Sequence, residues 1–258
     1  MKPTTAYGLP VLGCLAFLTA LSPSRAETIS FDHLDDYERS FQSVGPNAPG
    51  WIAKAGVGGS GGLVAGNSSY LACVKTAQPL DVQPGQSVTV SMNFLYKDQA
   101  TRISERNAGV YLTANPEASP LDTPEGAMIA VFLHNVSNTP GQEQTVVSLS
   151  TGGKVALGDK GRAYAGSEWW DSDALRGHWC QMEVKFTKLP TAGLWELGIK
   201  IFDLGEDGLA EPSEIFSINE PEVNAQALFA APQIFAGFQN HRYDRGFRSM
   251  DDFTVVIE

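Results

Sequence analysis

The sequence has few cysteines, few basic residues and no long apolar run beyond its N-terminus. Three cysteines in 258 residues exclude a small scaffold held together by many disulfides. The 18 basic residues are outnumbered by 29 acidic residues, and such an acidic surface repels nucleic acid and anionic lipid. No later segment approaches the roughly 20 apolar residues of a membrane-spanning helix. We therefore expect no nucleic-acid partner and no membrane span, and neutral sugars or cations as easier ligands.

The N-terminal segment has the pattern of an export signal. Lys2 gives a short basic start, Val11 to Leu21 is apolar, and Ser24 to Ala26 fits the small-x-small cleavage pattern. We predict a secretory signal peptide over residues 1–26, one mature domain over residues 27–258, and a secreted or periplasmic location. A lipoprotein is the alternative, because Val11 to Cys14 resembles a lipobox, but little apolar sequence precedes it.

Alternating apolar and polar residues characterise the rest of the chain. Residues 179–186 alternate in this way, and after a turn at residues 188–193 the alternation resumes over residues 195–201. Two such strands make an antiparallel hairpin, which needs a second sheet to cover its apolar face. Strand patterns recur at residues 28–32, 71–74, 86–96, 108–113, 127–134, 145–150, 234–238 and 253–257. The sequence therefore predicts an all-β fold, a single-domain antiparallel β-sandwich of two sheets.

Cys73 and Cys180 are the two cysteines that remain after processing. Export permits a disulfide between them. Cys180 equally suits the apolar face of its strand, where a cysteine behaves as a small hydrophobic residue. Both alternatives stay open, because the sequence does not give the distance between the two Cα atoms.

Three short segments have compositions typical of turns. Gly56 to Gly62 lacks the Lys-Ser/Thr ending of a phosphate loop, so we expect a tight strand connection. Phe202 to Gly208 is rich in carboxylates that suit calcium, but its spacing is not that of an EF-hand, and Asp and Gly are ordinary turn residues. We expect a turn there, and an acidic turn at Asp35 and Asp36.

A series of short motifs occurs in a characteristic order. They are Ile29 to Asp32, Gly58 to Leu63, Gly177 to Trp179, Phe202 to Gly205, Phe235 to Phe238 and Asp251 to Val255. In this order the chain resembles the concanavalin A-like lectin/glucanase superfamily, with a LamG-like jelly roll. The resemblance spans the mature chain and implies a jelly-roll sandwich with a concave face that binds glycans in many relatives. Lectins, hydrolases and lyases share this fold, so the site must decide the function.

Two enzyme types of this superfamily can be compared with the sequence. Laminarinase-like hydrolases carry Glu-x-Asp-x-x-Glu, and here no Glu is followed two positions later by Asp. Gln239 to His241, with Tyr243, is similar to the Gln-x-His and Tyr of alginate lyases, but the motif comes too late in the chain. The family's Arg-x-Glu-x-Arg strand is also missing. The acidic residues of the segment 168–173 are expected to form a surface turn.

The remaining candidates are sugar-binding and metal-binding side chains. Exposed aromatic rings stack on sugars while neighbouring polar groups bind the hydroxyls, which favours Tyr164, Trp169, Trp170, Asn240, His241, Arg242 and Tyr243. Core packing is the alternative for the tryptophans, above all for Trp179 and Trp195. Asp32 and Asp251 or Asp252 would be neighbours if the first and last strands pair. They then suit either a structural calcium ion or hydrogen bonds from the backbone.

Together these observations predict an exported, non-catalytic, lectin-like protein whose partner is a polysaccharide or glycan. No cofactor is required, and a structural calcium ion is an open alternative. A glycan-degrading enzyme of the same fold, either polysaccharide lyase or glycoside hydrolase, is the second hypothesis. A structural cell-surface or matrix protein is the third. The sequence gives neither the glycan nor the oligomeric state.

Overall fold

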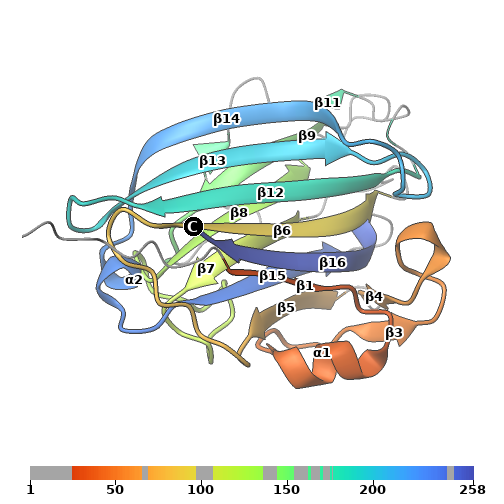
Figure 1. Cartoon of the computed structure of the whole chain (residues 1–258), viewed down its shortest axis with the longest axis horizontal. Coiled ribbons are helices and arrows are strands. Elements are labelled where there is room, and N and C mark those ends of the chain that lie inside the picture. Colours follow the sequence, from red (N-terminus) through yellow and green to blue (C-terminus); the bar gives the residue numbers. More distant parts are fainter. Residues whose placement is uncertain are drawn as a thin grey trace, which may run out of the picture.

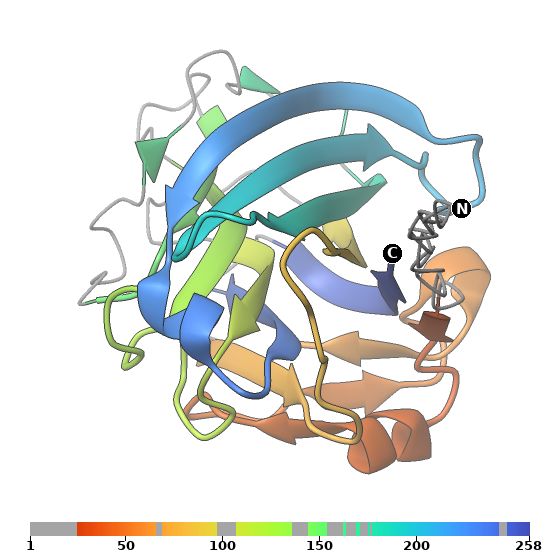
Figure 2. The same cartoon turned by 60° about the vertical axis from the view of Figure 1, so that its left-hand side comes forward.

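Two antiparallel sheets form the body of the protein (Figure 1). The computed structural model describes residues 25–65, 69–96, 107–135, 144–153, 162–163, 169–170, 175, 177–242 and 247–258. Among these residues it places two short α-helices, α1 (Leu34–Ser40) and α2 (Gln226–Ala230), and one 3-10 helix, η1 (Val57–Gly59). The turned view in Figure 2 shows the two sheets as curved layers. The predicted all-β sandwich is confirmed.

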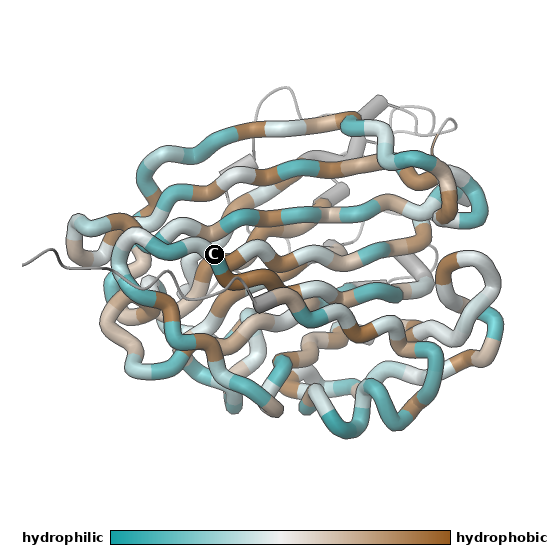
Figure 3. The backbone as a smooth tube through the Cα atoms, in the orientation of Figure 1, coloured by the Kyte–Doolittle hydropathy of each residue, from teal (hydrophilic) through white to brown (hydrophobic). Residues whose placement is uncertain are grey.

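The first sheet faces the viewer in Figure 1. Its strand order is β14 (Ser213–Asn224), β13 (Leu194–Asp203), β12 (Trp179–Lys188), β6 (Ser87–Tyr96), β16 (Phe247–Ile257), β4 (Gly62–Val64) and β3 (Gly50–Ile52), and β1 (Arg25–Ile29) also pairs with β16. The predicted hairpin is β12 and β13, with Val184 opposite Ile199. The backbone tube in Figure 3 shows the alternation of polar and apolar residues along these strands.

The second sheet lies behind the first. Its order is β10 (Arg162–Ala163), β9 (Gln144–Ser150), β8 (Met128–Asn135), β7 (Asn107–Thr113), β15 (Phe235–Arg242), β5 (Ser69–Lys75) and β2 (Phe41–Ser43), and β11 (Trp169–Trp170) also pairs with β9. The strand patterns at residues 127–134 and 145–150 correspond to β8 and β9, which pair antiparallel. No helix in the described ranges is long and apolar enough to cross a membrane.

The main core fills the space between the facing sheets. The inward residues of β6 are fully buried, as their alternation predicts. Four phenylalanines pack edge to face or tilted at one end of this core, with ring centroids 5.1 to 6.2 Å apart: Phe31, Phe41, Phe238 and Phe253. Trp179 and Trp195 are buried, so the core interpretation is confirmed for both.

A second apolar cluster lies on the other face of the second sheet. It contains Val74, Tyr111, Met128, Ala130, Phe132 and Phe235, which alternate along their strands with main-core residues such as Cys73 and Val110. The Tyr111 hydroxyl donates a 3.0 Å hydrogen bond to the Cys73 carbonyl oxygen. The segment between β7 and β8 is held against β2, because Gln42 Nε2 donates a hydrogen bond to the Pro116 carbonyl oxygen at 2.6 Å. This outer face is therefore largely closed to solvent.

The structure also corrects three expectations. The acidic turn predicted at Asp35 and Asp36 is wrong, because these residues begin α1. The strand pattern at residues 234–238 ends too early, because β15 continues to Arg242. The disulfide alternative is not formed. Cys73 and Cys180 are free thiols buried in different sheets, and burial raises the pKa of each to about 12.

Candidate functional site

A groove of about 490 Å³ lies at one end of the first sheet. One wall is the connection from β3 through η1 to β4, the other is the turn between β13 and β14, and the ends of β6, β12 and β16 contribute to the lining. The lining includes Ile52, Lys54, Trp179, Glu206, Asp207 and Ser249. This volume falls within the roughly 300 to 1,000 Å³ that is usual for small-molecule sites.

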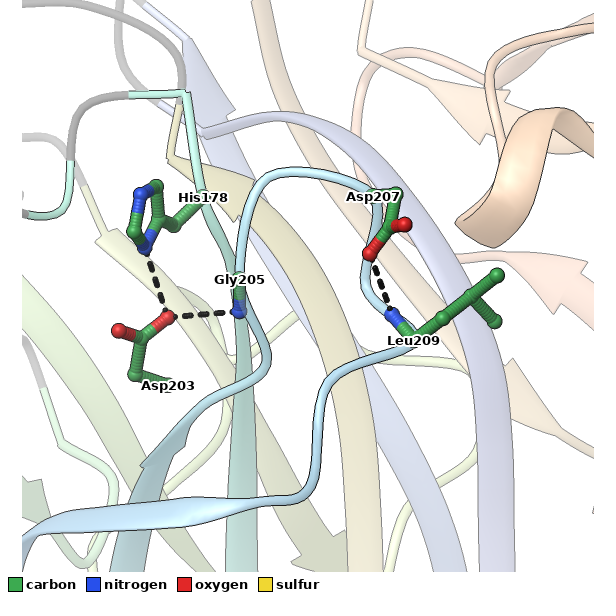
Figure 4. Close-up of polar contacts among 5 residues, drawn as sticks. All are labelled: His178, Asp203, Gly205, Asp207 and Leu209. Atoms are coloured by element: carbon green, nitrogen blue, oxygen red, sulfur yellow. Dashed lines mark hydrogen bonds and ion pairs between the residues drawn. The ribbon is translucent and has the colours of Figure 1, made fainter.

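The turn between β13 and β14 is held by its own carboxylates (Figure 4). Asp203 Oδ1 accepts the Gly205 N–H at 2.8 Å and lies 2.9 Å from His178 Nδ1. Asp207 Oδ1 accepts the Leu209 N–H at 3.0 Å. The segment is thus the turn that its composition predicted, and these side-chain hydrogen bonds are of the kind that stabilises such turns.

The glycine-rich wall is built around Asp251. Asp251 Oδ2 accepts the Val57 N–H at 2.8 Å and the Ser60 hydroxyl at 3.1 Å. A Cβ at Gly56 would overlap both the backbone of Gly61 and the Asp251 carboxylate, so only glycine permits this approach. The segment is the tight connection that we expected, and it also forms a wall of the groove.

The two walls touch each other at one point. The Gly58 N–H donates a 2.7 Å hydrogen bond to the Asp207 carbonyl oxygen. Beside it, a Cβ at Gly58 would contact the Leu209 side chain, and a Cβ at Gly208 would contact both Val57 and Trp179. Segments about 150 residues apart in the chain therefore hold one another in place.

The groove presents charged groups beside apolar ones. Lys54, Glu206 and Asp207 are exposed, while Trp179 is only 3% exposed and forms the floor. Ile52, 45% exposed, adds apolar surface. Neither Lys54 nor Glu206 forms a hydrogen bond or ion pair within the described ranges. These charges are therefore available to a ligand.

The aspartates of the first and last strands come together as predicted, since β1 pairs with β16. Burial raises the pKa of Asp251 to about 7, and the charge of Asp252 adds to that rise. Burial, together with the charge of Asp32, also raises the pKa of Asp252. Asp251 accepts backbone N–H groups, and no three His, Cys, Asp or Glu side chains of the described part are placed to hold a metal ion. A structural calcium ion stays an untested prediction.

The sugar-binding residues predicted from the sequence lie away from this groove or outside the described residues. Tyr164 and Tyr243 are outside them. Trp169 and Trp170 form β11, and His241 and Arg242 end β15, but only their backbone is described.

Asn240 is fully buried in β15, between Leu71 and Ala108. The expectation that it lies exposed to a sugar is wrong. Its neighbour Gln239 is buried too, and Gln239 Oε1 accepts the Tyr70 hydroxyl at 3.1 Å.

Two curved antiparallel sheets in this order define a concanavalin A-like jelly roll, and comparison with solved structures shows the same fold. Lectin I from Ulex europaeus with the methyl glycoside of α-L-fucose has a TM-score of 0.57 at 11% identity, covering 92% of this chain and 98% of the lectin. Peanut lectin with a nonapeptide has a TM-score of 0.55 at 13% identity, covering 92% and 99%. The Bauhinia forficata lectin with GalNAc has a TM-score of 0.55 at 12% identity, covering 91% and 99%. No family model and no curated protein matches the sequence.

Proposed function

We propose that this is an exported carbohydrate-binding protein that holds a short saccharide in the end groove without cleaving it. The observation that carries the proposal is the groove itself, which combines an apolar floor at Trp179 with the unpaired charges of Lys54 and Glu206. Sugars present apolar C–H faces and many hydroxyl groups, so such a mixture of surfaces suits them. The fold supports this, because structures that share it are lectins solved with a fucoside or GalNAc.

The arrangement of the carboxylates supports binding over hydrolysis. Glycoside hydrolases place two carboxyl groups on either side of the scissile bond. Here Glu206 and Asp207 are neighbours on one wall of the groove, and the other wall contributes Lys54. One oxygen of Asp207 also accepts a hydrogen bond from the turn backbone. Among the described lining residues, the groove therefore offers contacts to a sugar without an opposed pair of acids.

The test measures binding and product release together. The mature protein is incubated, with calcium present, with a panel of soluble and insoluble polysaccharides, and both retention and new reducing or unsaturated ends are recorded. We expect retention without new ends. Lys54→Ala should weaken retention, because it removes a donor from the groove, whereas Glu38→Gln on the exposed side of α1 should leave it unchanged.

The other outcomes each favour a different hypothesis. New reducing ends would identify a glycoside hydrolase, and unsaturated ends a lyase, and either result would direct attention to His241 and Tyr243 or to Glu168. Absence of both retention and new ends would favour a structural protein. Retention that Lys54→Ala leaves intact would contradict the groove as the site.

A further inference from the structure

The charges around the groove are unequally distributed between its walls. Residues 201–241 contain no Lys or Arg and seven acidic residues: Asp203, Glu206, Asp207, Glu211, Glu214, Glu220 and Glu222. The turn between β13 and β14, which carries Glu206, Asp207 and Glu211, is one wall of the groove. Lys54 is the one basic residue among the described lining residues. The described lining thus has two carboxylates against one ammonium, in a chain whose net charge is −11.

The acidic groups on this wall differ in how far they are already engaged. Asp203 is bound to His178 and to the Gly205 N–H, so it supports the turn. Asp207 is exposed and uses Oδ1 for the Leu209 N–H, while its Oδ2 forms no hydrogen bond within the described ranges. Glu206 is exposed and has no partner within the described ranges. Glu206 and Asp207 Oδ2 therefore form an acceptor site for a donor on the ligand.

We propose that the groove selects saccharides that carry free amino groups. The inference rests on the proposed function and names its ligand class. The sugar's ammonium group donates hydrogen bonds to Glu206 and Asp207, the Lys54 ammonium donates to a hydroxyl or ring oxygen, and the exposed Ile52 contacts the apolar face of the ring.

Charge-assisted hydrogen bonds are the reason for this preference. A bond from an ammonium to a carboxylate is roughly twice as strong as one between neutral groups. A neutral sugar gains less from these two carboxylates, and an anionic sugar is repelled by them and by the net negative charge of the chain. Lys54 alone does not reverse this balance, because it faces two carboxylates.

The experiment compares three oligosaccharides of matched length by calorimetry: glucosamine oligomers, N-acetylglucosamine oligomers and galacturonate oligomers. A mildly acidic buffer keeps the amines protonated. We expect the glucosamine oligomer to bind about tenfold more tightly than its acetylated counterpart, the difference that one charge-assisted contact supplies. The galacturonate oligomer should bind least. Added salt should reduce the preference, because these groups are exposed.

Variants separate the local site from the overall charge. Glu206→Gln should abolish most of the preference for the amino sugar, whereas Glu38→Gln changes the net charge equally and should preserve it. Melting temperatures of both variants should match the wild type, because both side chains are exposed and form no described contacts. An equal loss of preference in both variants would show that overall charge attracts the ligand, and would refute the proposal.

Failure of this inference differs from failure of the proposed function. Equal affinity for free and acetylated oligomers overturns the amino-sugar preference but leaves a carbohydrate-binding groove in place. If none of the three oligomers binds but another glycan of the polysaccharide panel is retained, the amino-sugar preference is likewise overturned and the carbohydrate-binding groove stays in place. Absence of retention on every glycan overturns the proposed function itself.

Discussion

The stability of this protein should fall as the pH rises through neutrality, because of the buried carboxyl group of Asp251. Asp251 is 1% exposed, and burial raises its pKa to about 7, although the Val57 N–H and the Ser60 hydroxyl oppose the shift. An unfolded chain has an ordinary aspartate pKa near 3.9. The folded state therefore binds this proton more tightly than the unfolded state. The resulting stabilisation is full below the unfolded pKa and is lost as the pH rises through the folded pKa.

The magnitude follows from the difference between the two pKa values. They differ by about 3 units, and one unit corresponds to about 1.4 kcal/mol, so the full effect is about 4 kcal/mol. Between roughly pH 5 and pH 7 about 2 kcal/mol of it should be lost. Asp252, whose pKa is also raised, acts in the same direction.

The assay is urea unfolding across this pH range at constant ionic strength and with a chelator, for the wild type and for Asp251→Asn. Asn has one acceptor oxygen, so the variant loses hydrogen bonds to the loop at every pH. The informative quantity is the change with pH of the difference between the two unfolding free energies. The wild type should lose about 2 kcal/mol relative to the variant. Parallel pH profiles would refute the reasoning, because Asp251 would then titrate alike in both states.

Three further results are expected. Gly56→Ala should lower the free energy of unfolding by about 2 kcal/mol or more, because its methyl group overlaps Gly61 and Asp251. In the control Gly85→Ala the methyl group meets no atom within 4 Å, so the variant should lose only about 1 kcal/mol, from the positive φ of Gly85. Equal losses in the two variants would contradict the steric explanation. Two thiols should react in denatured, unreduced mature protein and none in the native protein, because Cys73 and Cys180 are buried; fewer than two in the denatured state would indicate a disulfide. A chelator should leave the melting temperature unchanged, because the loop already supplies hydrogen bonds to Asp251, whereas a lower melting temperature would support structural calcium.

The sheets could be predicted because their burial is periodic. In β6 the predicted inward residues Val88, Val90, Met92 and Phe94 are all fully buried, and in β12 buried residues alternate with more exposed ones along most of the strand. In a strand that has one face on the core, apolar and polar residues alternate along the sequence with a period of two. Pairing of neighbouring strands such as β12 with β13 followed from the short turn between them.

Elements without a clean period were missed. The helix α1 has seven residues, too few for a helical pattern to recur. The spacing of His33 and Asp36 is compatible with the start of a helix. Asp36 Oδ2 accepts the His33 N–H at 3.0 Å in the manner of a capping box. The edge strand β14 is mostly exposed, and two register shifts interrupt its alternation. Bulges and exposure remove the signal that identifies an interior strand.

The groove was beyond sequence reasoning for a different reason. Its glycine-rich wall and its carboxylate turn were each recognised as turns, and both interpretations are correct. Their contact at Gly58 and Asp207 depends on the order of strands in the sheet. In that order β16 lies between β6 and β4, and the glycine-rich connection before β4 reaches the turn that follows β13. Periodicity shows which face of a strand is buried but not which distant strand lies beside it. Aromatic residues with polar neighbours therefore indicated positions 164–170 and 240–243, whereas the exposed charges among the described lining residues of the groove belong to Lys54, Glu206 and Asp207.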